Sequence, residues 1–278
     1  MTTDQQQLTL VLGGSTGKTG RRVAERLAAR GVPLRIGSRT AELPFDWQDA
    51  RTWAAALHGV ASVYMAYVPD LAVPGAAAAI RAFTQLAVQS DVKRLVLLSG
   101  RGEEEAQICE QIVQTCGLEW TILRASWFAQ NFSENFMRDL VVSGEVALPV
   151  GDVAEPFIDT EDIADVAVAA LTDDTHVGQL YELTGPHLLT FAEAIRQIAS
   201  ATGRDIRYLP ISYQEFASAL AADGVPADVT ALLTYLFTTV LDGRNAHLAD
   251  GVQRALGREP RDFAAYVRHT AATGVWQA

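Results

Sequence analysis

The sequence predicts an α/β protein in which helices cover both faces of a parallel β-sheet. Residues 8–12 form an apolar, strand-like run that leads into a glycine-rich turn and then a helical segment at 21–30. Strand-like and helical segments continue to alternate, and the strands are apolar on both faces, as parallel strands buried between two layers of helices are. We therefore expect a Rossmann-type, doubly wound sheet, followed by a smaller and mainly helical C-terminal part.

The glycine-rich turn predicts an anion-binding site. Glycine lets the backbone turn tightly and approach a phosphate, and the N-terminus of the following helix directs N–H groups and partial positive charge toward it. We assign the whole turn to cofactor binding: Gly14, Ser15, Thr16, Gly17, Lys18, Thr19 and Gly20. A nucleoside-triphosphate loop does not fit, because its first glycine would fall on Leu12. Three evenly spaced glycines at a strand–helix junction also argue against an ordinary flexible loop.

The remaining elements follow in chain order. The expected strands of the sheet are 32–39, 61–67, 93–99 and 118–124, and the helices between them are 49–58, 75–88 and 103–115. Beyond them we expect a helix at 127–142, a short strand at 145–150 and a helix at 159–171 capped by Asp159. Residues 180–184 predict a strand that returns to the sheet.

Two capping boxes mark helix starts in the C-terminal part. In each, a hydroxyl residue precedes a glutamate by three positions, as in Thr190–Glu193 and Ser212–Glu215. Further helices are expected at 226–241, 247–256 and 261–272. We place the cofactor-binding core at 1–150, with 156–185 returning to it, and a smaller, mainly helical substrate-binding part at 186–278.

Composition narrows the class of protein. The chain has 278 residues and a formal net charge of −11, which disfavours a nucleic-acid partner held through phosphates. Neither a signal region nor a run of membrane-spanning length stands out. Two cysteines, Cys109 and Cys116, and five histidines without ligand spacing indicate no metal site. We expect a cytoplasmic monomer or homodimer that acts on a small molecule, without membrane or nucleic-acid partners.

The end of the second strand indicates the cofactor. In dinucleotide-binding folds an acidic residue there takes the ribose hydroxyls of NAD, and a basic residue takes the 2′-phosphate of NADP. This chain has Ser38 and Arg39, with no acid before Glu42. Arg39 can hold a phosphate through two hydrogen bonds, Ser38 can add a third, and Lys18 contributes positive charge. A solvated loop arginine is the alternative, but beside the glycine turn the pair favours NADP.

Several motifs occur in the order seen in NmrA-like atypical short-chain dehydrogenases. They are the glycine motif 13–20, Ser38-Arg39, Phe45-Asp46-Trp47, 94–99, 123–128, Asn131-Phe132, 162–164 and 181–186. The chain resembles this family over nearly its whole length. Within the family it is most similar to bacterial relatives of the ergot-alkaloid festuclavine and agroclavine dehydrogenases.

The resemblance implies positions for further residues. Asp46 and Trp47 are expected near the adenine, Val68 and Pro69 along the cofactor, Ser99 beside the nicotinamide, and Ala125 at both cofactor and substrate. The implied substrate contacts are Tyr67, Trp127, Phe128, Asn131, Phe132 and Tyr235. Ser99 and Tyr67 are expected to help catalysis in a minor way. In the alternative reading, Trp127 and Phe128 are core aromatics and Ser99 caps a helix.

One departure from orthodox short-chain dehydrogenases constrains the reaction. Those enzymes use Tyr-x-x-x-Lys, where tyrosine donates a proton and lysine lowers its pKa. This chain has only two lysines, Lys18 and Lys93, and no tyrosine has a lysine four residues on. Hydride addition to a ketone creates an alkoxide that needs a proton, whereas an iminium ion becomes a neutral amine and a quinone or enone disperses its charge.

Two function classes therefore remain open, together with a smaller third. The first is an NADPH-dependent reductase of an iminium, enone or quinone-type small molecule, in keeping with secondary metabolism. The second is a non-catalytic NADP-binding sensor or regulatory protein, as some NmrA-like proteins are. The third is a redox-neutral lyase or isomerase that uses the same fold.

Overall fold

The computed structural model describes residues 7–277, which fold into two compact units. The first unit comprises the chain up to Ala125 together with 160–183 and 250–258, and the second comprises 126–159, 184–249 and the chain from Glu259 onward. Residues 126–150, which we had placed in the cofactor-binding core, thus belong to the second unit. Residues 250–258, which we had placed in the helical part, belong to the first.

The first unit is built on a six-stranded parallel sheet with the strand order β2-β1-β3-β4-β5-β8. The strands are β1 (Leu8–Leu12), β2 (Leu34–Gly37), β3 (Val60–Met65), β4 (Arg94–Gly100), β5 (Glu119–Ala125) and β8 (Gln179–Leu183). The strand order reverses direction between β1 and β3, and ligands of such sheets bind at the carboxyl ends of the strands beside this point. The predicted doubly wound fold is confirmed.

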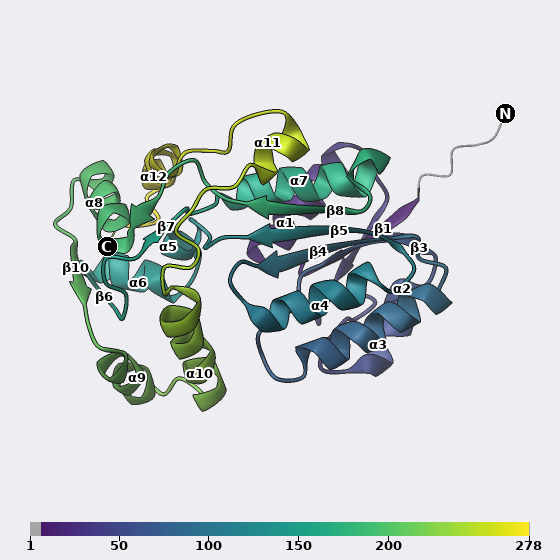
Figure 1. Ribbon diagram of the computed structural model, residues 1–278, viewed down its shortest axis with the longest axis horizontal. Coiled ribbons are helices and arrows are strands. Elements are labelled where there is room, and N and C mark those ends of the chain that lie inside the picture. Colours follow the sequence, from purple (N-terminus) through teal and green to yellow (C-terminus); the bar gives the residue numbers. More distant parts are fainter. Residues whose placement is uncertain (1–6, 278) are drawn as a thin grey trace. The chain divides into compact units, whose positions relative to one another are not determined.

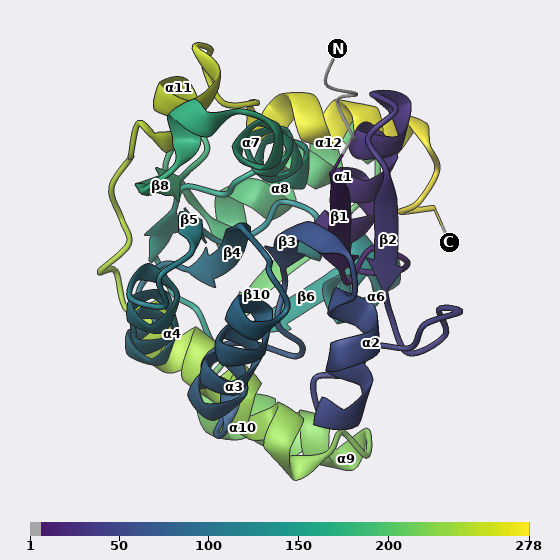
Figure 2. The same cartoon turned by 90° about the vertical axis from the view of Figure 1, so that its right-hand side faces the viewer.

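Helices cover both faces of this sheet. They are α1 (Lys18–Ala29), α2 (Trp53–Leu57), α3 (Ala76–Gln89), α4 (Glu104–Gln114), α7 (Thr160–Thr172) and α11 (Gly251–Leu256), with short 3₁₀ turns η1 (Ala50–Thr52) and η2 (Asp174–His176). In Figure 1 and Figure 2, α1 and α7 lie on one face, and α2, α3 and α4 lie on the other. The strands are therefore buried from both sides, which explains their uninterrupted apolar sequences.

Ion pairs fasten α1 and the segment 250–258 to α7. Arg26 on α1 pairs with Asp165 at 2.7 Å, and Arg258 pairs with the same residue at 2.6 Å. Arg258 also pairs with the fully buried Asp162 at 2.7 Å. Gly251 packs so closely on β8 that a Cβ there would lie 2.1 Å from the carbonyl oxygen of Glu182. These contacts explain why residues 250–258 return to the first unit.

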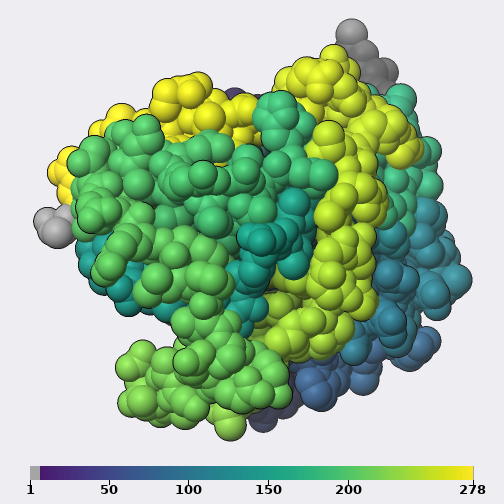
Figure 3. Space-filling model, turned by 60° about the vertical axis from the view of Figure 1, so that its left-hand side comes forward, coloured from purple at the N-terminus to yellow at the C-terminus, as the bar shows by residue number. Residues whose placement is uncertain are grey.

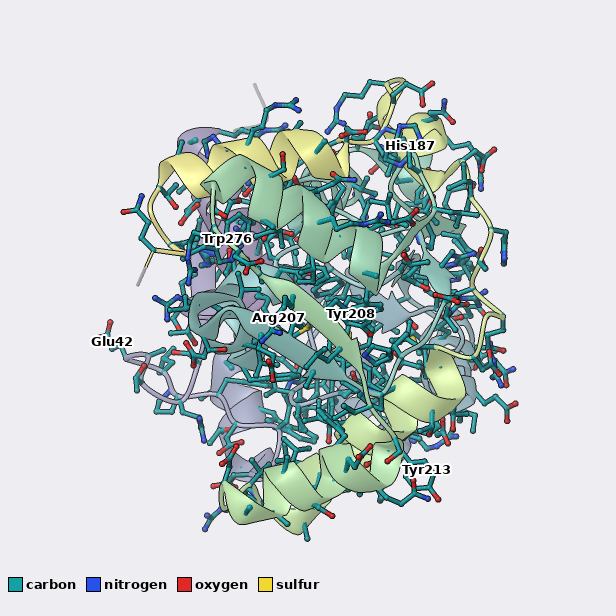
Figure 4. All side chains as sticks on the ribbon, turned by 90° about the vertical axis from the view of Figure 1, so that its left-hand side faces the viewer. Glu42, His187, Arg207, Tyr208, Tyr213 and Trp276 are labelled. Carbon is teal, nitrogen blue, oxygen red and sulfur yellow. The ribbon has the colours of Figure 1, made fainter. Side chains whose placement is uncertain are left out.

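The second unit has two small sheets and six α-helices within its described residues. Its elements are α5 (Asn131–Glu134), α6 (Phe136–Ser143), β6 (Glu145–Leu148), β7 (Ala154–Glu155), β9 (Leu189–Thr190), α8 (Phe191–Thr202), β10 (Arg207–Pro210), α9 (Tyr213–Ala222), α10 (Ala227–Tyr235) and α12 (Phe263–Ala272), with a π-helical turn η3 (Leu236–Val240). Strand β10, which carries Arg207 and Tyr208 in Figure 4, runs parallel to β6. The segment bearing α9 is mostly exposed and projects at the lower edge of Figure 3.

Local sequence signals predicted helix starts correctly where the sequence contains a capping box. Both capping boxes form, and α8 and α9 begin where they were predicted. The predicted helix 127–142 is wrong, because residues 126–130 are not helical and Phe128 instead pairs with Ile158. Asn135, with φ −148° and ψ −162°, then separates α5 from α6 and caps α6 through its side chain. The predicted helices 226–241 and 247–256 also change, since the first ends in η3 and the second begins only at Gly251.

Candidate functional site: the carboxyl edge of the parallel sheet

The glycine turn joins β1 to α1 and is shaped by close backbone contacts. Gly13 has φ +71°, and its carbonyl oxygen accepts a hydrogen bond from the N–H of Gly17 at 3.0 Å. A Cβ would lie 2.6 Å from that oxygen at Gly17 and 2.4 Å at Gly20, so neither position has room for a side chain. Helix α1 begins at Lys18, three residues earlier than predicted, and no side chain caps its N-terminus. This is a cradle into which an anion can approach the backbone closely.

Gly13 is the glycine that our assignment of the turn omitted. Its left-handed backbone is the conformation that only glycine adopts easily, and its carbonyl oxygen organises the two later glycines. The signal was present in the adjacent pair Gly13-Gly14. Gly14 is required for a different reason, because a Cβ there would lie 2.9 Å from Cδ1 of Ile36 on β2.

Arg39 lies next to this turn, just beyond β2. The carbonyl oxygen of Gly37, the last residue of β2, accepts a hydrogen bond from the N–H of Gly13 at 3.0 Å. Ser38 and Arg39 follow directly, and the Ser38 hydroxyl lies 3.4 Å from that of Thr40. Arg39 is exposed, and among residues 7–277 its guanidinium has no hydrogen-bond or ion-pair partner. Its charge is therefore available to an anion.

Trp47 is a core residue rather than an open stacking surface. It is 8% exposed, and its ring packs against Phe45, Phe83 and Tyr67 at centroid distances of 5.0, 5.1 and 4.9 Å. The indole N–H donates to the carbonyl oxygen of Ala66 at 3.0 Å. Trp47 thus holds the backbone that follows β3. The neighbouring Asp46 accepts a hydrogen bond from the Trp53 indole through its own carbonyl oxygen.

The segment after β3 presents a mixed surface. Val68 is 59% exposed, Pro69 is exposed and joined to it by a cis peptide bond, and Tyr67 is partly buried. Burial raises the pKa of the Tyr67 hydroxyl above its ordinary value, so that the hydroxyl stays protonated at neutral pH. An apolar side chain therefore stands beside a neutral hydroxyl at this strand end.

Ser99 is tied into a buried network of charges. Its hydroxyl donates to Oε1 of Glu110 at 2.7 Å, and Glu110 accepts two further hydrogen bonds from Arg124 on β5. Arg124 also reaches Glu182 on β8 at 2.9 Å, and Glu182 lies 3.5 Å from Nε of the buried Arg101. The Ser99 proton is thereby directed at a carboxylate. Glu103, not Ser99, occupies the N-cap position of α4, and its side chain makes no capping hydrogen bond there.

The sequence gives little sign of this network. Arg124 stands out as a charge within the apolar part of β5, but Glu110 lies in a helix with several other glutamates and glutamines. Their pairing depends on how β4, β5 and β8 lie side by side. Hydrogen bonding to Glu110 raises the pKa of Arg124 further above its already high value. The network fixes the carboxyl ends of the three strands, including Ala125, whose carbonyl oxygen accepts from the N–H of Arg101.

The expected substrate residues of the second unit differ in their surroundings. Phe132, which we expect to contact substrate, is fully buried among Phe157, Phe191 and Phe263 and packs into the core of that unit. Trp127 is only partly buried, yet its indole Nε1 is buried and has no hydrogen-bond partner. The remaining expected substrate contacts of this unit, Phe128, Asn131 and Tyr235, are also partly buried.

Neither a metal-binding cluster nor a membrane-spanning helix is found among residues 7–277. Within that range no group of three or more histidine, cysteine, aspartate or glutamate side chains is arranged to hold a metal ion. The same residues contain no helix that has both the length and the apolar composition to span a bilayer. The Cys109 thiol is buried, and burial together with the charge of Glu110 raises its pKa to about 11, which makes it a poor nucleophile.

Comparison with known proteins then identifies the family. No protein-family model matches the chain. An uncharacterized oxidoreductase of Bacillus subtilis (strain 168) is 32% identical over 98% of this chain and 99% of its own. NAD(P)H azoreductase of Xenophilus azovorans is 32% identical (90% and 87% covered), and agroclavine dehydrogenase of Claviceps fusiformis is 30% identical (94% and 96%). The chain belongs to this family of NAD(P)H-dependent oxidoreductases.

Solved structures agree on the fold of this oxidoreductase family. A triphenylmethane reductase of Citrobacter sp. superposes with a TM-score of 0.75 at 19% identity, covering 96% of this chain and 99% of that one. An NADPH-dependent quinone oxidoreductase of Escherichia coli, complexed with NADPH, gives 0.76 at 20% identity, covering 95% and 99%. The predicted resemblance to the agroclavine dehydrogenases is therefore confirmed by the sequence relatives, and the predicted fold by the solved structures.

Proposed function

We propose that the protein transfers hydride from NADPH to a small molecule of the quinone, enone or iminium type. The observation that carries the proposal is the glycine cradle at β1 beside Arg39, an exposed cation whose guanidinium no other described residue pairs. The names of the relatives add support: an azoreductase and an agroclavine dehydrogenase by sequence, and quinone and triphenylmethane reductases by fold. The NmrA-like label and a role in secondary metabolism belong to the same proposal.

The residues present fit NADPH. A Cβ at Gly17 or Gly20 would strike the carbonyl oxygen of Gly13, so only glycine lets the turn close this tightly. The N–H groups at the start of α1 can then approach phosphate oxygens closely. Ser15 and Thr16 are exposed at the tip of the turn, where their hydroxyls can donate hydrogen bonds. Arg39 would hold the 2′-phosphate, with Ser38 and Lys18 as further donors. When bound, the nicotinamide supplies a hydride to the acceptor.

The chain's own residues position the reaction more than they activate it. Glu110 holds Ser99 at the end of β4, and Trp47 holds the segment that bears Tyr67 and Val68. No Tyr–Lys pair exists in the sequence to donate a proton to an alkoxide. Acceptors that end neutral or disperse their charge need less help of this kind. We keep Trp127, Phe128, Asn131 and Tyr235 as proposed substrate contacts, and Ala125 as a contact of both ligands.

The test is NADPH consumption against a panel of iminium ions, quinones, enones, azo compounds and simple ketones. We expect turnover with the charge-dispersing acceptors and the iminium ions, slow or no turnover with ketones, and a preference for NADPH over NADH. Ketones reduced as fast as quinones would contradict the proposed chemistry. Tight NADPH binding without turnover of any acceptor would favour the alternative function, a cofactor sensor. The observation behind this alternative is that the Ser99 hydroxyl already donates its proton to Glu110.

A further inference from the structure

Two carboxyl groups meet at the carboxyl ends of the neighbouring strands β3 and β4. Asp70 follows β3 by five residues, Glu103 follows β4 by three, and their side chains are hydrogen-bonded to each other. An ionised carboxylate only accepts hydrogen bonds, so a carboxyl–carboxyl hydrogen bond requires that one partner carry a proton. The contact itself therefore specifies a pair that shares one proton.

The packing indicates which partner holds the proton. Glu103 is 7% exposed, and its carboxyl lies against Gly100, where a Cβ would be 2.0 Å from Oε1. Burial raises the pKa of Asp70 as well, but Asp70 is less buried than Glu103. Its carboxylate also accepts a hydrogen bond from the N–H of Ala72 at 2.8 Å, which favours the ionised form. Glu103 is therefore the acid of the pair and Asp70 the acceptor. Gly100 leaves the space that the acid occupies.

The charged and titratable groups around Glu103 agree with this assignment. They are Asp70 beyond β3, and Glu105, Cys109 and Glu110 on α4. Burial, followed by the charge of Asp70, raises the pKa of Glu103 well above its ordinary value, and Glu105 and Glu110 act in the same direction. All of these effects favour the protonated form of Glu103.

We propose that the Asp70–Glu103 pair supplies the proton when the acceptor becomes an anion on reduction. This inference rests on the proposed function. The pair lies at the same carboxyl edge as the glycine turn, and Glu103 is four residues from Ser99, where the resemblance places the nicotinamide. Ser99 itself donates its proton to Glu110 and the chain has no Tyr–Lys pair, so the carboxyl pair is the proton source that remains at this strand end.

A C–H bond of the reduced nicotinamide would break, and its hydride would carry two electrons to the acceptor, so that the cofactor is oxidised as the acceptor is reduced. A C–H, N–H or, in a quinone, O–H bond forms on the acceptor, and negative charge is left on another oxygen or nitrogen. That atom takes the shared proton, so an O–H or N–H bond forms while the carboxyl O–H bond breaks. The pair then holds two negative charges, whose repulsion draws a replacement proton from water. An iminium ion becomes a neutral amine on hydride addition and needs no proton from the pair.

The first test needs neither cofactor nor substrate. Infrared spectroscopy of the whole protein should show the C=O stretch of a protonated carboxylic acid that persists at neutral pH. Glu103→Gln should remove this band. Glu104→Gln, which makes the same change at the exposed neighbour, should leave it. A spectrum without such a band in the wild type, or a band that survives in Glu103→Gln, would overturn the proposal.

The second test compares two acceptors in the same variants. With saturating NADPH, Glu103→Gln should slow quinone or enone reduction by about tenfold or more, while iminium reduction and the Kd of NADPH stay unchanged. The pH dependence of quinone reduction should also be lost. Asp70→Asn, which removes the acceptor of the shared proton, provides a second variant if Glu103→Gln does not fold.

The outcomes separate the two proposals. Equal slowing with both acceptors, or a weakened grip on NADPH, would assign the pair a structural role and overturn the inference while the proposed function stands. A wild type that reduces no acceptor would overturn both. Reduction by the wild type with unchanged rates in Glu103→Gln and Asp70→Asn would overturn the inference alone.

Discussion

Two arginines near the carboxyl edge of the six-stranded sheet have opposite surroundings. Beyond β2, Arg39 is exposed and its guanidinium has no partner within residues 7–277. On β5, the Arg124 side chain is 20% exposed and bonded to both Glu110 and Glu182. A charge held without a partner beside a glycine cradle is available to a ligand, whereas a buried charge surrounded by partners fixes the backbone. The comparison predicts that mutating the first changes binding and mutating the second changes folding.

The largest effect is expected at Arg124. Arg124→Ala leaves the 3%-exposed Glu110 carboxylate without its main partner, and breaking a buried ion pair on one side costs about 3–5 kcal/mol. The measurement is the free energy of unfolding in urea. The double variant Arg124→Met/Glu110→Gln should recover part of the loss, because it leaves no unpaired charge. A change below about 1 kcal/mol would mean that the network is loose and behaves like surface pairs.

Arg39 should show the opposite behaviour. Arg39→Ala removes a charge-assisted contact worth about 1.5–3 kcal/mol, so NADPH should bind about ten- to a hundredfold more weakly. NADH affinity and the free energy of unfolding should hardly change. Fluorescence titration with both cofactors measures this, and Arg30→Ala, at the far end of α1 and also exposed, is the matched control. A wild type that prefers NADH, or equal weakening for both cofactors, would refute the NADP assignment.

A substitution in the glycine cradle tests how the shape of the backbone contributes to cofactor binding, separately from the charge of Arg39. In Gly20→Ala the new Cβ would press on the carbonyl oxygen of Gly13, which costs about 1–3 kcal/mol where the backbone must shift. Because the pyrophosphate is common to both cofactors, NADPH and NADH should weaken together, unlike in Arg39→Ala. Titration of the two cofactors decides the point, with Gly151→Ala as a control outside the cradle, because φ is not positive there and a Cβ would meet nothing within 4 Å. Selective loss of NADPH would place the 2′-phosphate at the turn instead.

The carboxyl pair between these two regions predicts a pH effect. The folded-state pKa of Glu103 is raised, chiefly by burial, above the unfolded value of about 4.3. The folded protein thus keeps a proton that the unfolded chain has released, and stability falls as pH rises from about 4 toward the folded pKa. Urea unfolding over this range should show the fall in the wild type and in Glu104→Gln, and a smaller fall in Glu103→Gln. Identical slopes in all three would contradict the shared proton.

Much of the cofactor end of the molecule was readable in the sequence. The glycine spacing, the apolar strands and the basic residue after β2 depend on neighbours along the chain or on backbone conformation. The two capping boxes are similar, since a hydroxyl and a glutamate three residues apart meet within one helical turn. Trp47 and Phe132 were placed less well, because an aromatic residue has the same sequence signature in a core as at a ligand.

The sequence by itself determined the parallel sheet, the tight glycine turn and the cation beside it, because local conformation and periodicity are encoded over a few residues. The tertiary structure alone decided that Ser99 is bonded to Glu110, that Glu103 meets Asp70, and that residues 250–258 return to the first unit. Each of these depends on residues brought together from different elements. Burial then changes their chemistry: it stabilises a shared proton between two carboxyl groups that would both be ionised in water.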